Sequence, residues 1–246
     1  FTIYGAVSTP PIVNMGALNP YIGGTVALTA TASDTDSGIS SVVFQYSAAA
    51  GGPWTTAGIG VLGTGGYVFN FDTTPLTDGA TYYFRAVATN GAGASTASDP
   101  VNAKIENTPP VMTLLKPAAE NAWLKANYQF EVQASDAQSG IKRLEISELS
   151  GSTWNLVCSS DVDPAVGGVY TLSCLGTPSE TATKIKAVVT NGAGKTSTVE
   201  RAVQVDTTAP IIPPNMLTAP ADSAVLQLGT NMIITWATTP PINEPH

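Results

Sequence analysis

The sequence contains almost no histidine, since its one imidazole is His246, the last of 246 residues. Ser-His-Asp and Cys-His sites need an imidazole beside the nucleophile, and zinc sites of the Cys/His type need one as a ligand. The nearest pair of acids, Asp161 and Asp163, falls in a predicted hairpin loop, where aspartate is ordinary turn material. We therefore predict that the protein has no catalytic residues and is not an enzyme.

Charged residues are also scarce, at 11% of the chain, and the net charge is −8. An acidic chain lacks the basic stripe that nucleic acid requires. No apolar run approaches the ~18 residues of a spanning helix, so we expect no membrane insertion. We expect the bases of the second half to pair with acids such as Glu131 and Glu145 on neighbouring strands; these bases are Lys142, Arg143, Lys184 and Lys186.

The chain repeats itself after about a hundred residues, which is typical of a duplicated domain. ASDTDSGI at 32–39 returns as ASDAQSGI at 134–141, and ATNGAG at 88–93 returns as VTNGAG at 189–194. The linker Pro109-Pro110 returns as Ala209-Pro210. The predicted units are residues 10–108, 109–208 and a truncated third domain at 209–246, preceded by residues 1–9 as the last strand of an upstream domain or a donor strand.

Hydrophobic residues alternate with polar ones at a period of two through most of both units, which predicts strands rather than helices. Turn signals such as Asn90-Gly91 separate the alternating segments. The predicted strands are 12–18, 25–32, 41–47, 54–59, 67–71, 81–89 and 95–106, then 111–116, 127–134, 142–148, 154–159, 169–174, 183–190 and 196–205. Such short, regularly punctuated strands indicate an all-β fold of tandem Ig-like β-sandwiches.

The segment from Leu76 to Ser95 resembles the last hairpin of fibronectin type III and bacterial Ig-like domains. It has Leu-x5-Tyr before an alternating strand, followed by Ala-x-Asn-Gly-x-Gly-x-Ser. The resemblance to tandem repeats of large bacterial surface proteins implies an extracellular location, secreted or at the cell surface. It also implies that Tyr82 is a corner tyrosine tied to the backbone, a tie that Thr183 cannot make in the second repeat.

The chain has two cysteines, Cys158 and Cys174, each at the end of a predicted strand. A hairpin joining these strands would bring the sulfurs face to face, and an extracellular chain would oxidise them. We predict a Cys158–Cys174 disulfide; the alternative is two separate buried thiols.

Calcium is the one metal that the residue types allow. Asp34 and Asp36 lie in the predicted B–C loop of the first domain, and Asp136 occupies the same loop of the second, near Glu106 at the domain junction. Calcium prefers six to eight oxygen ligands that include several carboxylates. The alternative is that Asp-x-x-Ser-Gly forms an Asx turn without a metal.

Trp54 and Trp154 follow flexible turns at equivalent places in the two repeats. An exposed indole stacks well on a sugar ring, so the two are candidate ligand-binding residues. The alternative is a packing role, which their equivalence in both repeats favours.

We expect a non-enzymatic structural or spacer array within an adhesin, a filament or another large surface protein. The alternative is a glycan- or protein-binding module that acts through the B–C and F–G loops. Expected partners are other domains of the same long chain or other copies of it. Phe1, Ile3 and Tyr4 have the aromatic and β-branched character of a donor strand and are the predicted assembly residues.

Overall fold

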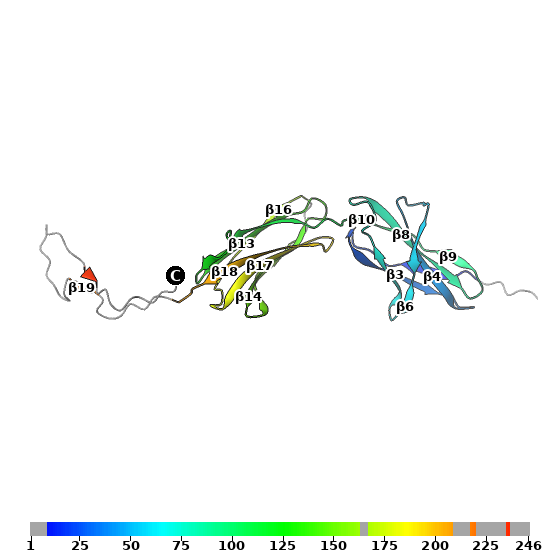
Figure 1. Cartoon of the computed structure of the whole chain (residues 1–246). Helices are drawn as coiled ribbons and strands as arrows, with labels where there is room; N and C mark the ends of the chain where they lie inside the picture. Colours follow the sequence, from blue (N-terminus) through cyan, green and yellow to red (C-terminus); the bar gives the residue numbers. More distant parts are fainter. Residues whose placement is uncertain (1–8, 163–166, 209–216, 220–234, 237–246) are drawn as a thin grey trace, which may run out of the picture.

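The computed structural model describes residues 9–162, 167–208, 217–219 and 235–236. All regular structure in these ranges is β-strand, and no helix there could cross a membrane. The strands form two β-sandwiches placed end to end along the chain (Figure 1). The predicted fold class, all-β tandem Ig-like sandwiches, is confirmed.

Domain 1, the sandwich of β1 to β10, consists of two sheets. One has the order β1 (Ile12–Met15), β3 (Thr25–Ser33), β7 (Gly66–Asp72) and β6 (Val61–Gly63). The other has the order β2 (Tyr21–Ile22), β10 (Val101–Ile105), β8 (Thr81–Asn90), β4 (Ile39–Ser47) and β5 (Thr55–Ile59), with β9 (Ser95–Ala97) also on β8. Alternate side chains from the two sheets, including Leu28, Phe44 and Phe84, fill a fully buried core.

Domain 2, the sandwich of β11 to β18, repeats this plan. Its smaller sheet has the order β11 (Val111–Lys116), β13 (Tyr128–Ser135) and β16 (Val169–Gly176). Its larger sheet has the order β12 (Ala122–Leu124), β18 (Thr196–Val205), β17 (Ala182–Asn191), β14 (Ile141–Ser150) and β15 (Thr153–Asp161). Phe130, Leu144 and Ile185 lie at the centre of its core.

The predicted strand at 95–106 is wrong in one respect, because it is broken between β9 and β10. Pro100 has no N–H for a strand ladder. Just before it, Ser98 turns inward, where its Oγ accepts the Ala86 N–H at 3.1 Å and donates to Asp99 O at 3.0 Å. The short strands β2, β6 and β12 were not predicted, because two or three residues give no readable period.

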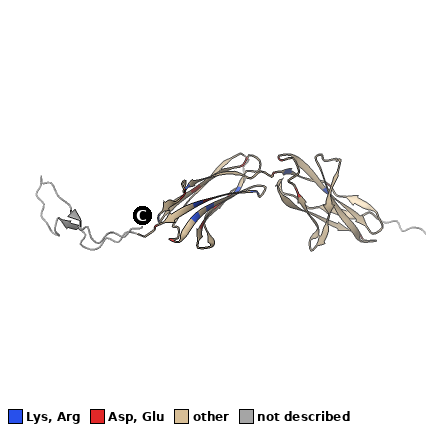
Figure 2. Cartoon of the chain, in the orientation of Figure 1, with Lys and Arg blue, Asp and Glu red and all other residues tan. Residues whose placement is uncertain are grey.

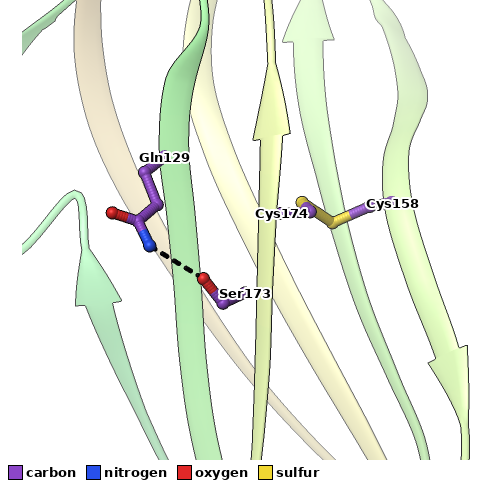
Figure 3. The surroundings of a disulfide bond; sticks show 4 residues. All are labelled: Gln129, Cys158, Ser173 and Cys174. Atoms are coloured by element: carbon purple, nitrogen blue, oxygen red, sulfur yellow. Dashed lines mark hydrogen bonds between the residues drawn. A yellow bond between two sulfur atoms is a disulfide. The ribbon is translucent and has the colours of Figure 1, made fainter.

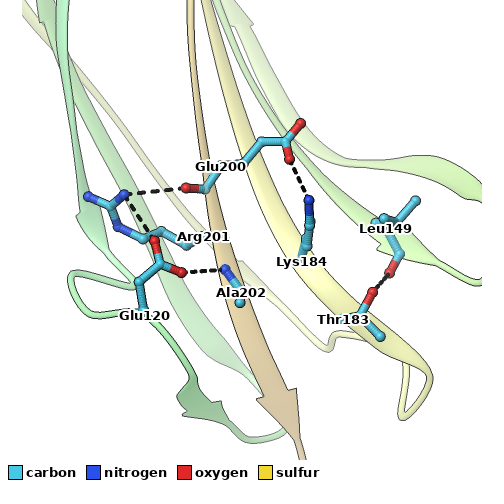
Figure 4. Close-up of polar contacts among 7 residues, drawn as sticks. All are labelled: Glu120, Leu149, Thr183, Lys184, Glu200, Arg201 and Ala202. Atoms are coloured by element: carbon cyan, nitrogen blue, oxygen red, sulfur yellow. Dashed lines mark hydrogen bonds and ion pairs between the residues drawn. The ribbon is translucent and has the colours of Figure 1, made fainter.

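Two of the four basic residues expected to pair in domain 2, Arg143 and Lys184, form ion pairs on the sheet surface. Figure 2 shows the Lys and Arg positions on its strands. Arg143 bonds both Glu145 and Asp161, at 3.0 and 2.7 Å. Lys184 bonds Glu200 on the neighbouring strand at 3.0 Å (Figure 4). The expected pairing of bases with acids is thus present at Arg143 and Lys184, whereas Glu131 pairs with Lys116 and Lys186 lies over the Trp154 ring.

The corner tyrosine expected in domain 1 is also present. The Thr77 N–H donates to the Tyr82 hydroxyl at 3.4 Å. In domain 2 the hydroxyl of Thr183 instead donates to Leu149 O on the adjacent strand, at 3.5 Å (Figure 4). The tie between loop and strand therefore exists in the first repeat and is replaced by a strand-to-strand contact in the second.

The predicted disulfide joins Cys158 and Cys174, whose Cα atoms lie 6.7 Å apart (Figure 3). The geometry behind the prediction was wrong, because β15 and β16 are not paired in one ladder. They are edge strands of different sheets. The bond therefore links the two layers of the sandwich at their open side, beside β16, where domain 2 has no described counterpart of β6.

The two ends of the chain lie mostly outside the described residues. Phe1, Ile3 and Tyr4, the predicted assembly residues, are among those not described. Of the third predicted unit the structure describes two short strands, β19 (Leu217–Ala219) and β20 (Thr235–Trp236), which pair antiparallel.

Candidate functional site

The candidate site is the junction where the B–C loop of domain 2 meets the end of domain 1. Asp136 shapes this loop because its Oδ1 accepts the N–H groups of Gln138, Ser139 and Gly140 at 3.0, 2.9 and 3.2 Å. The other carboxylate oxygen accepts the Asn191 amide at 3.0 Å. Burial opposes ionisation, but the hydrogen bonds from Asn191 and the loop N–H groups hold the pKa of Asp136 below its usual value.

The linker between the domains is fixed from both sides. Asp78 of domain 1 accepts the Asn107 N–H at 2.6 Å and the Thr108 hydroxyl at 2.7 Å. From domain 2, the Asn191 amide donates to Thr108 O at 3.3 Å. A linker with backbone and side chain both bonded loses the freedom of a flexible tether.

Two side chains of domain 2 also reach domain 1 directly. The Gln138 amide donates to Asp78 at 3.0 Å. Lys195, from the F–G turn between β17 and β18, lies over Gly23 and Gly24, where added Cβ atoms would each approach a Lys195 side-chain atom to 3.2 Å. Only glycine leaves room here, because a Cβ at Gly23 would also lie 1.8 Å from the Glu106 carbonyl oxygen.

Glu106 lies at the centre of the junction and is 1% exposed. Neither of its carboxylate oxygens has a hydrogen-bond partner in the described part of the chain, and the same is true of Gln138 Oε1. Burial raises the pKa of Glu106 to about 7; the side chain and backbone of Ser139 oppose the shift, and the neighbouring Asp136 carboxyl adds to it. The junction therefore encloses an acid that is largely protonated at mildly acidic pH. A hollow of about 190 Å³ adjoins it, lined in part by Thr108, Asp136 and Gln138.

The candidate calcium residues do not form one site. Asp34 accepts the Ser37 N–H at 2.7 Å and the Asn90 amide at 3.0 Å, which is the Asx turn seen again at Asp136. Asp36 instead binds Thr9, through both the hydroxyl and the N–H of that residue. No group of three or more metal-ligating side chains occurs among the described residues. The Asx turn alone accounts for an aspartate at positions 34 and 136, and calcium binding stays a prediction.

The two tryptophans carry a cation over the ring face. The Arg85 guanidinium lies 4.2 Å from the Trp54 ring centre, and the Lys186 ammonium lies 4.0 Å from that of Trp154. Both rings are half-buried. A sugar stacking on the same face of either ring would first have to displace a favourable cation–π contact. This geometry supports the packing interpretation, and sugar binding stays a prediction.

Sequence reasoning gathered Glu106, Asp136 and Asn191 at the junction but missed three contacting residues: Asp78, Gln138 and Lys195. A signal was available for the first, because Asp78 and Glu180 stand at equivalent places before the strand that carries the Asn-Gly turn. Nothing in the sequence distinguishes Glu106 as a buried residue, since its burial depends on how the next domain docks.

No known sequence family and no curated protein matches this chain. Among solved structures it is similar to the fibronectin(III)-like modules of Clostridium thermocellum CbhA, with 16% identity, a TM-score of 0.46, and coverage of 79% of this chain and 95% of that one. For the fibronectin domains of chicken CNTN1 the identity is 12%, the TM-score 0.47, and the coverage 80% and 69%. For a tandem repeat from the extending region of a large adhesion protein, the identity is 18% and the TM-score is 0.31, and the match covers 82% of this chain and 50% of that one.

Proposed function

We propose that this chain is a non-enzymatic spacer, a string of Ig-like modules that extends a larger extracellular protein such as an adhesin or surface filament. The observation that carries the proposal is the junction, where Asp78 and Asn191 hold the linker from opposite domains. A held linker converts two small domains into one elongated body, which is the property that a spacer needs. The Cys158–Cys174 disulfide supports an extracellular location.

Small-angle X-ray scattering of the full chain tests the spacer proposal. We expect the scattering profile of an extended, stiff pair of domains, with a cross-section equal to that of one sandwich. The variant Asp78→Ala removes the acceptor for Asn107, Thr108 and Gln138. In this variant the distribution of interatomic distances should broaden, or its maximum should shorten. The control variant Asp99→Ala lies away from these contacts and should leave the profile unchanged. A compact or fully flexible wild-type chain would contradict the proposal.

The second candidate is binding of a glycan or protein through the B–C and F–G loops. We assign this candidate to domain 1, because in domain 2 Gln138, Asn191 and Lys195 of these loops are engaged at the junction. The equivalent loops of domain 1 contain Asp34, Asp36 and Asn90. A glycan array and a pull-down with wild type and with Asp36→Ala test this: retention by wild type alone supports binding at the loops, and no retention removes the candidate.

A further inference from the structure

A threonine that precedes two prolines leads into each domain, and the domain that follows holds it in the same way. These residues are Thr9 before domain 1 and Thr108 before domain 2. The Asn90 amide donates to the Thr9 carbonyl oxygen at 3.0 Å. The Asn191 amide donates to the Thr108 carbonyl oxygen at 3.3 Å. The two threonines therefore occupy equivalent positions relative to the loops of the following domain.

The hydroxyl of this threonine is nevertheless bound by a different domain in each linker. Thr9 donates its hydroxyl and its N–H to Asp36, which belongs to the domain that follows. Thr108 donates its hydroxyl at 2.7 Å to Asp78, which belongs to the domain that precedes. The carboxylate thus comes from the downstream domain at Thr9 and from the upstream domain at Thr108.

Gln138 occupies in domain 2 the position that Asp36 occupies in domain 1. The Asp36 N–H donates to Asp34 Oδ1 at 3.2 Å. The Gln138 N–H donates to Asp136 Oδ1 at 3.0 Å, so the same Asx turn positions both residues. Where the loop of domain 1 carries an acid, the loop of domain 2 carries an amide, and this amide donates to Asp78 at 3.0 Å.

One threonine hydroxyl cannot serve two carboxylates, because it has a single proton to donate. Asp78 Oδ2 already accepts the Thr108 hydroxyl and the Gln138 amide. An aspartate at position 138, placed as Asp36 is placed beside Thr9, would bring a second carboxylate to the same hydroxyl. No proton would remain for that second carboxylate, and it would lie close to the first.

Both carboxylates carry a charge at neutral pH. The bonds from the Thr9 hydroxyl and N–H hold the pKa of Asp36 below its usual value. The bond from the Asn107 N–H, followed by others, does the same for the pKa of Asp78. Because like charges at such close range repel, a junction with both acids is less stable than a junction with one.

The end of domain 2 follows the pattern of Asp78. Glu180 accepts the Thr207 N–H at 2.7 Å and the Thr208 hydroxyl at 3.2 Å. Domain 2 therefore offers an acid to the linker that leaves it, as domain 1 does.

We propose that Asp78 and Gln138 are a specificity pair, by which a junction accepts one carboxylate at the linker threonine, from the preceding or the following module but not from both. The inference rests on the proposed spacer role and adds the rule that decides which modules can be neighbours. A module with an acid in the place of Gln138, as domain 1 has with Asp36, fits only behind a module without an acid in the place of Asp78. Because Glu180 is such an acid, domain 1 does not fit behind domain 2, and the order of the two modules is specified.

The experiment introduces Gln138→Asp into the full chain, which gives domain 2 the residue of domain 1. Double electron–electron resonance below pH 7 measures the distance between spin labels at Ala27→Cys and Thr171→Cys, two exposed strand positions. We expect the fraction of molecules outside the wild-type distance to increase at least about fivefold, because the two carboxylates repel. The matched control Gln138→Asn has the shape of aspartate without its charge, and it should produce a smaller increase.

The double variant Asp78→Asn with Gln138→Asp exchanges the acid and the amide, and it should restore the narrow distribution. The amide at position 78 keeps an oxygen for the Asn107 N–H and can donate to the new carboxylate, which takes the Thr108 hydroxyl.

Three results would overturn the proposal while the wild-type distribution is narrow: a Gln138→Asp chain that matches wild type, a Gln138→Asn chain as broad as Gln138→Asp, or a double variant that stays broad. The spacer proposal survives each of them. A broad distribution in wild type would contradict both proposals.

Discussion

At the scale of single residues, Glu106 is the most unusual group in the molecule. A fully buried acid beside a second carboxylate is expensive to ionise, so it lowers the stability of the docked state whenever it is charged. Asp136 beside it behaves oppositely, since four donors stabilise its charge. Two neighbouring acids therefore titrate in separate pH ranges.

We predict that the junction weakens as the pH rises. Because the pKa of Glu106 increases from 4.5 to about 7 on folding, its contribution is fully present below about pH 4.5 and is lost as the pH rises through 7. The loss amounts to about 3 kcal/mol at most, at roughly 1.4 kcal/mol for each pH unit. Denaturant unfolding across this range, with a chelator present, measures it.

The variant Glu106→Gln is the matched control for this prediction, because it keeps the shape and removes the titration. It should be more stable than wild type above pH 7 and should lose the pH dependence between 4.5 and 7. The depressed pKa of Asp136 acts only at lower pH, where its contribution is lost as the pH falls. An identical pH profile in wild type and variant would show that Glu106 is not the titrating group.

We predict a modest calcium effect centred on Asp34 and Asp36. Two carboxylates on a surface loop bind calcium weakly, so a shift of the melting temperature should require millimolar metal. The double variant Asp34→Asn with Asp36→Asn keeps the side-chain oxygens that form the turn, and it should remove the shift. If calorimetry shows neither heat of binding nor a shift of the melting temperature in wild type, both residues serve only to form the turn.

At the scale of strands, the disulfide is the main structural difference between the two repeats. It links β15 to β16 across the open side of domain 2, whereas domain 1 extends that side with β6. The two repeats thus stabilise the same edge by different means, one covalent and one through a strand.

Replacement of both cysteines, Cys158→Ser with Cys174→Ser, should destabilise domain 2. On the chain-entropy argument, a crosslink that closes a loop of this length stabilises by about 3 kcal/mol. Scanning calorimetry should show a lower transition for domain 2, and a reducing agent should produce the same change in wild type. If the transition is insensitive to both treatments, the bond has no stabilising role.

Much of the strand pattern could be predicted from the sequence, because alternation and Asn-Gly turns are local. The break at Ser98–Pro100 was missed since Val101 to Ile105 continues the apolar pattern beyond it. The cysteine pairing was predictable, but its geometry was not, because a hairpin in the sequence does not reveal which sheet each strand joins. The junction contacts of Gln138 and Lys195 depend on how one domain docks on another, and no local pattern encodes that.

At the scale of the whole molecule, a spacer requires the junction to hold the two sandwiches in one relative orientation. Asp78, Thr108 and Asn191 connect domain, linker and domain by successive hydrogen bonds. The contacts between the domains are mainly polar, and such interfaces permit domain motion unless the linker is itself restrained. The restraint on Thr108 is therefore what the spacer proposal depends on.

The most direct test is a distance distribution between spin labels at Ala27→Cys and Thr171→Cys, two exposed strand positions in different domains, measured by double electron–electron resonance. We predict a single narrow distance in wild type below pH 7, and a broader distribution when Asp78→Ala removes the linker contacts. A broad distribution in wild type, unchanged by Asp78→Ala, would contradict this prediction.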